Sequence, residues 1–175
     1  MAFVLDMLLG ASLGICVFTD LLRGKVYNVV TMSAMVVGVA GSAIMHGWSG
    51  LLGSMGGLLL GGALLFLPFA FHVLGAGDVK LSAAVGAIAG PWFVFQTVMA
   101  AFLFAAVATV VIRLYQGRLL QTVKRSGLFF LGLVFPRYRP DMSEARQEQG
   151  IPFALCLAGG AMAVKLAGYD WVFQG

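Results

Sequence analysis

The sequence predicts an all-α membrane protein with about six transmembrane helices. Of its 175 residues, 61% are hydrophobic and only 10% are charged, whereas soluble domains are about half apolar and a quarter charged. The mean hydropathy is +0.97, and the apolar residues are gathered in long runs. This composition excludes a disordered chain, a nucleic-acid-binding module and a disulfide scaffold.

Six apolar runs are candidates for membrane helices, because about 20 apolar residues cross the hydrocarbon core. They cover approximately residues 3–19, 29–45, 51–74, 79–90, 92–112 and 151–168. The fourth run is short and rich in Ala and Gly, so it must pack against protein or continue past Asp78. In the third run, Gly53, Gly57 and Gly61 lie four residues apart on one helix face. This spacing permits close helix packing, which is the role we expect for them.

The segment at about 113–150 differs in composition from the apolar runs and is rich in Arg and Lys. Within it, residues 127–135 are apolar but too few to span a bilayer, so we interpret them as interfacial or re-entrant. The whole chain, 1–175, is therefore expected to form a single integral-membrane domain with one polar cytoplasmic loop.

The distribution of cations predicts the orientation. Alternation through six helices places all but one of the 11 Lys and Arg residues on the same side, the exception being Lys165 in the last run. An excess of cations marks the cytoplasmic face, so both termini are expected outside. The N-terminal run has no Lys or Arg and no small-x-small cleavage site, which favours a retained helix over a secretory signal.

Two of the seven acidic residues have positions that suggest chemistry. Asp20 and Asp78 each lie at the cytoplasmic end of an apolar run, where ionisable groups are costly and often functional. Two carboxyl groups about 3 Å apart share one proton. The ionised member of such a pair can activate water while the protonated member polarises a peptide carbonyl. For each Asp taken alone, the alternative is an ordinary helix-end residue near the lipid headgroups.

The residues around these acids form two motifs. Asp78 lies in the sequence Gly75-Ala76-Gly77-Asp78-Val79-Lys80, whose glycines let the backbone break between helices and approach an extended substrate. Asp20 is followed by Val26-Tyr27-Asn28. Together these residues resemble the type IV prepilin peptidase family, within the GxGD class of intramembrane aspartyl proteases. The family's usual proline is replaced by Tyr27, and Ile151-Pro152-Phe153 resembles the segment that opens the family's last helix.

The resemblance implies the GxGD protease fold and an aspartic-type endopeptidase that removes the leader peptide of a prepilin. Asp20 and Asp78 take the places of the catalytic aspartates, and Gly75, Gly77, Lys80 and Asn28 match residues that bind substrate or support the site. No cofactor or metal is implied, and the two cysteines, Cys16 and Cys156, are isolated from each other and from any His.

The resemblance also implies a location and a substrate. The expected substrate is a prepilin with a basic leader and an apolar helix, cleaved at the cytoplasmic face of the inner membrane, with lipid as the other partner and no nucleic acid. The chain lacks the CxxC pairs of the larger, bifunctional enzymes and is similar to the peptidase-only branch that serves Flp (tight-adherence) pili. The archaeal preflagellin branch also fits.

Three alternatives remain open. A transporter or channel subunit would use the two Asp residues to bind ions or relay protons. A related GxGD protease would cleave signal-peptide remnants. An assembly scaffold of a secretion machine would tolerate substitution of both acids.

Overall fold

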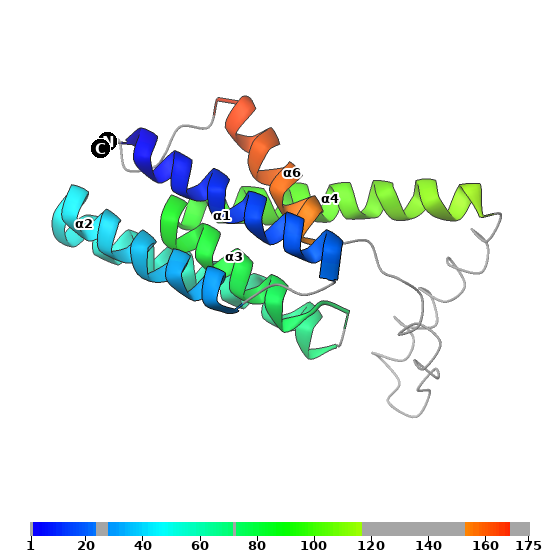
Figure 1. Ribbon diagram of the computed structural model, residues 1–175, viewed down its shortest axis with the longest axis horizontal. Helices are drawn as coiled ribbons and strands as arrows, with labels where there is room; N and C mark the ends of the chain where they lie inside the picture. The colour runs from blue at the N-terminus through cyan, green and yellow to red at the C-terminus, as the bar shows by residue number, and fades with distance from the viewer. Residues whose placement is uncertain (1, 24–27, 72, 117–152, 169–175) are drawn as a thin grey trace. The chain divides into compact units, whose positions relative to one another are not determined.

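The computed structural model describes residues 2–23, 28–71, 73–116 and 153–168, and these are helical apart from short connections. The helices are α1 (Ala2–Arg23), α2 (Asn28–Ala70), α3 (Ala76–Ala89), α4 (Pro91–Tyr115) and α6 (Phe153–Leu166) (Figure 1). No strand occurs in these residues, so the all-α prediction is confirmed. The apolar segment 127–135, and most of the polar loop around it, lie outside the described residues.

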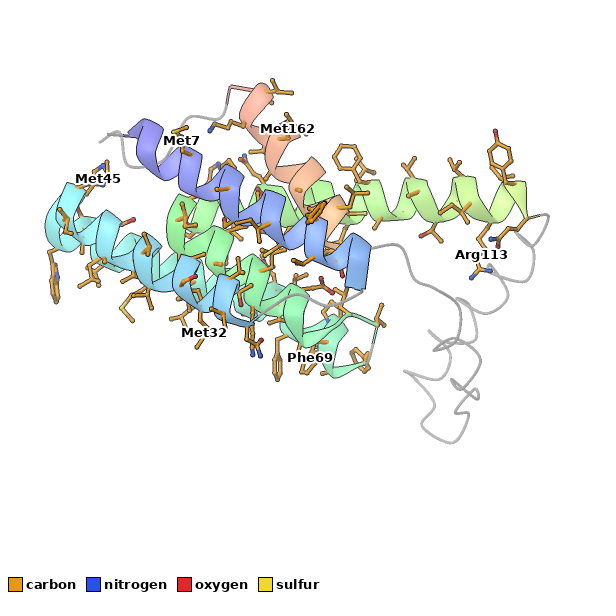
Figure 2. The ribbon with its side chains drawn as sticks, in the orientation of Figure 1. Met7, Met32, Met45, Phe69, Arg113 and Met162 are labelled. Carbon is orange, nitrogen blue, oxygen red and sulfur yellow. The ribbon has the colours of Figure 1, made fainter. Side chains whose placement is uncertain are left out.

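Two of the helices, α2 and α4, are long and apolar enough to cross a membrane. The segment Leu9–Asp20 of α1 and the whole of α6 are shorter apolar helices. The expected count of six spans is therefore not confirmed and stays a prediction. Many large apolar side chains are exposed, such as Ile44 at 81% and Leu103 at 66%, and Figure 2 shows Met32 and Phe69 on the outer side of α2. An apolar surface of this extent requires an apolar surrounding.

The helix α2 consists of two helical segments joined by a sharp break at Gly47. Gly47 has φ 61° and ψ −137°, a conformation open to glycine and strained for other residues. A Cβ on Gly50 would collide with the carbonyl oxygen of Ser42, although residues eight apart in a straight helix are separated by about 12 Å. The chain thus reverses near Met45, as Figures 1 and 2 show. The break expected between the second and third apolar runs is present at this glycine.

The short helix α3 forms the centre of the bundle. Residues 81–89 are all buried, and α3 contacts α1, α2 and α6. The run was expected to pack against protein or to continue past Asp78, and it does both, because the helix begins at Ala76. Its closest neighbour is α2, where Gly57 meets Gly86 so closely that a Cβ on either would collide with the carbonyl of the other. A Cβ on Gly61 would be 2.5 Å from the carbonyl oxygen of Ser82, so Gly57 and Gly61 serve the close packing expected of them.

The turn from α3 to α4 consists of Gly90. Its φ of 85° suits glycine, and its N–H donates to the Gly86 carbonyl at 2.8 Å. Pro91 opens α4, where its missing N–H leaves no helical bond unmade. The first half of α4 packs on α6, with the Phe102 and Phe153 rings 5.7 Å apart.

The chain divides into two compact units, residues 1–104 with 152–175, and residues 105–151. Of the second unit, the structure describes the end of α4, where the Thr109 hydroxyl donates to the Ala105 carbonyl at 2.7 Å. Both candidate catalytic acids belong to the first unit.

Candidate active site

Asp78 lies in the first turn of α3, held by the glycine that precedes the helix. Gly75 is extended, with φ −80° and ψ 153°, and its N–H donates to the Asp78 carboxylate at 3.2 Å. In return, the Asp78 N–H donates to the Gly75 carbonyl at 3.1 Å. An acidic side chain at the third helical position commonly reaches back in this way. The GxGD sequence therefore fixes the carboxylate at the start of α3, with Gly77 in the same turn.

Asp20 lies near the end of α1, and its side chain meets the start of α6. Its carboxylate accepts a hydrogen bond from the backbone of Ala154, in the first turn of α6, and α1 contacts α6. The N–H groups of a first turn have no acceptor within their own helix, so a carboxylate there satisfies one of them. Sequence reasoning did not identify Ala154. The available signal was the resemblance of the adjacent Ile151-Pro152-Phe153 to the segment that opens the last helix.

The charge of Asp20 reaches Asp78, and the helices that carry the two acids, α1 and α3, contact each other. Asp20 directly follows the first apolar run and Asp78 directly precedes the fourth, and we expect both runs in the membrane. The pKa of Asp78 is raised to about 6, mainly by burial and to a smaller extent by the charge of Asp20, while the Gly75 hydrogen bond lowers it. Burial also raises the pKa of Asp20, while the Ala154 hydrogen bond lowers it. Such an arrangement favours retention of a proton by the pair.

The two remaining polar motif residues contact each other. The Lys80 ammonium donates a hydrogen bond of 2.9 Å to the side-chain carbonyl of Asn28, across 52 positions of sequence. Asn28 is the first residue of α2, and Lys80 belongs to the first half of α3. The structure thus connects the end of one aspartate motif to the end of the other.

The described residues contain no group of three or more His, Cys, Asp and Glu side chains arranged to hold a metal ion. Cys16 and Cys156 are both buried and free. His46 lies at the break of α2, and His72 lies outside the described residues. The polar side chains brought together near the start of α3 are the two carboxyl groups and the Asn28–Lys80 pair.

An all-helical chain with an apolar surface and two half-buried carboxyl groups at helix ends has the features of a membrane-embedded enzyme. The model of the type IV leader peptidase family matches residues 7–112, and the chain belongs to this family. The resemblance seen in the sequence is thereby confirmed, and membership implies a peptidase. The matched residues include both acids and the Asn28–Lys80 pair. No curated protein and no solved structure matches the chain.

Proposed function

We propose that the protein is an aspartyl endopeptidase that removes the leader peptide of type IV, Flp-like prepilins at the cytoplasmic face of the inner membrane. The observation that carries the proposal is that Asp20 and Asp78, from different motifs, lie on two helices that contact each other, α1 and α3. Each carboxylate accepts a backbone hydrogen bond at a helix N-terminus, from Ala154 or from Gly75. Family membership supports the peptidase activity.

In this mechanism the apolar helix of the prepilin lies in the bilayer, with the scissile bond at the level of the two acids. The ionised carboxylate takes a proton from water as the water oxygen attacks the peptide carbon. The protonated carboxyl group donates its hydrogen bond to the carbonyl oxygen, which gains negative charge. A proton then passes to the leaving nitrogen as the C–N bond breaks. The pair exchanges one proton during the cycle, as coupled carboxyl groups do.

The cytoplasmic site follows from the positions of the cations in the sequence, because the segments next to Asp20 and Asp78 carry Arg23, Lys25 and Lys80. A prepilin leader is basic and stays on the same side of the membrane. The substrate therefore meets the acids without its leader crossing the bilayer.

The test is cleavage of co-expressed prepilins by the parent protein and by the variants Asp20→Asn and Asp78→Asn. Each variant is expected to lose processing and to retain membrane insertion, as judged by the size of the pilin on an immunoblot and by membrane fractionation. The matched controls are Asp6→Asn and Asp170→Asn, which lie outside both motifs and are expected to cleave normally. Near-normal cleavage by either motif variant would contradict the dyad.

The same purified variants separate the peptidase from the transporter alternative. Proton or cation flux into liposomes that disappears with either Asp, without any cleavage of prepilin by the parent, would favour transport. Cleavage without such flux supports the peptidase.

A further inference from the structure

The hydrogen bond between Lys80 and Asn28 joins α3, which carries Asp78, to the start of α2, the helix that follows α1 and its Asp20. Lys80 follows Asp78 by two residues, and Asn28 follows Asp20 by eight. The bond length is 2.9 Å. It is therefore a direct link between the two aspartate motifs that does not involve either carboxylate.

The direction of Lys80 on α3 argues against a direct ion pair between its ammonium and the carboxylate of Asp78. Successive residues of a helix are rotated by about 100°, so Lys80 leaves α3 roughly opposite to Asp78. Its ammonium is directed to the start of α2, where Asn28 accepts its hydrogen bond.

We propose that Asn28 and Lys80 are positioning residues. Their hydrogen bond holds α3 against the start of α2, and α2 contacts α1, so the bond sets the separation of Asp78 and Asp20. This inference rests on the proposed function for its kinetic readout. Chemistry between two groups is sensitive to their placement, and an error of about 1 Å costs on the order of 100-fold in rate. Loss of the bond therefore lowers kcat, with a smaller effect on KM.

The kinetic test is a double-mutant cycle with Asn28→Ala and Lys80→Met. Each single variant is expected to lose roughly tenfold in kcat, the effect of losing a hydrogen bond to a charged group at an exposed site. The double variant is expected to lose little more than either single variant, because both remove the same interaction. Additive losses, or a loss confined to KM, would overturn the inference.

Conservative variants serve as controls for a general loss of folding. Asn28→Asp keeps an acceptor for the Lys80 ammonium, and Lys80→Arg keeps a charged donor, so both are expected to retain most of the activity. Asn28→Ala leaves the cytoplasmic cations unchanged, which separates the hydrogen bond from the effect of charge on membrane orientation. If Asn28→Asp loses as much activity as Asn28→Ala, the hydrogen bond does not position the two acids.

A geometric test does not depend on proteolysis. In a Cys16→Ala/Cys156→Ala background, cysteines introduced by Asp20→Cys and Asp78→Cys are expected to cross-link on mild oxidation. Adding Lys80→Met is expected to slow cross-linking several-fold, and adding Lys80→Arg is not. An unchanged rate with Lys80→Met would overturn the inference even if the protein cleaves prepilin. A slowed rate in a protein that cleaves no substrate would support the inference and refute the proposed function.

Discussion

The backbone of Ala154, in the first turn of α6, donates a hydrogen bond to the carboxylate of Asp20 near the end of α1. Asp78 has its counterpart in the N–H of Gly75, at 3.2 Å. Each candidate catalytic acid is thus placed at the N-terminus of a helix, where the unpaired N–H groups and the helix dipole favour negative charge. Burial opposes this effect and raises the pKa of both groups.

The pH dependence of cleavage follows from the raised pKa of Asp78, about 6. A raised pKa means that the carboxyl group keeps its proton to higher pH, and the mechanism needs one protonated and one ionised member. We therefore expect kcat/KM to fall as the pH rises through about 6, when the second proton leaves the pair. It should also fall at lower pH, when both groups are protonated. Rates on a prepilin peptide, measured with purified enzyme from about pH 4 to pH 8, would test this bell-shaped profile. A rate that stays constant over this range would refute the shared proton.

The contact between Gly57 of α2 and Gly86 of α3 predicts the effect of a single methyl group. Gly57→Ala would drive a Cβ into the Gly86 carbonyl, so the helices must separate, at a cost of about 1–3 kcal/mol. The matched control is Gly56→Ala, because no atom lies within 4 Å of its Cβ position. We expect a lower thermal midpoint in detergent for the first variant alone. Equal midpoints would show that the helices do not pack at this distance.

The break at Gly47 predicts a cost of a different kind. The position is open, with no atom within 4 Å of a Cβ, but the φ of 61° and ψ of −137° strain any other residue. Gly47→Ala is therefore expected to destabilise by about 1–3 kcal/mol through the backbone alone. Gly14→Ala, in open space within α1, is the control and should leave the thermal midpoint unchanged or raise it slightly. Full stability of Gly47→Ala would mean that the chain does not reverse here.

Two buried serines that face the centre of the bundle are expected to differ. The Ser54 hydroxyl donates to the Ala87 carbonyl at 2.5 Å, whereas the Ser82 hydroxyl is buried with no hydrogen-bond partner among the described residues. Ser54→Ala removes a bond worth about 1 kcal/mol, and Ser82→Ala removes an unpaired polar group whose burial is unfavourable. Thermal midpoints should fall for Ser54→Ala and stay equal or rise for Ser82→Ala. The opposite order would contradict the hydrogen bonding described.

Much of the fold could be predicted because hydropathy and glycine patterns are local properties. The apolar runs at 3–19, 79–90 and 92–112 correspond to α1, α3 and α4. The change of direction between the second and third runs occurs at Gly47, whose φ and ψ are not helical. The short run around α3 was expected to pack against protein from its length and its small residues, and its burial confirms this. The number of membrane crossings was not confirmed, since two helices among the described residues are both long and apolar enough to cross a membrane.

The sequence by itself determined the helical class, the small-residue packing surface and the family, because these depend on composition and on residues close together along the chain. Only the tertiary structure decided which residues contact each other. Gly86 packs against Gly57, the backbone of Ala154 donates to the carboxylate of Asp20, and Lys80 donates to Asn28. A backbone N–H is present at every residue except proline, so no residue type marks the one that binds Asp20. Such contacts join segments distant in sequence, and they exist only after the helices have packed.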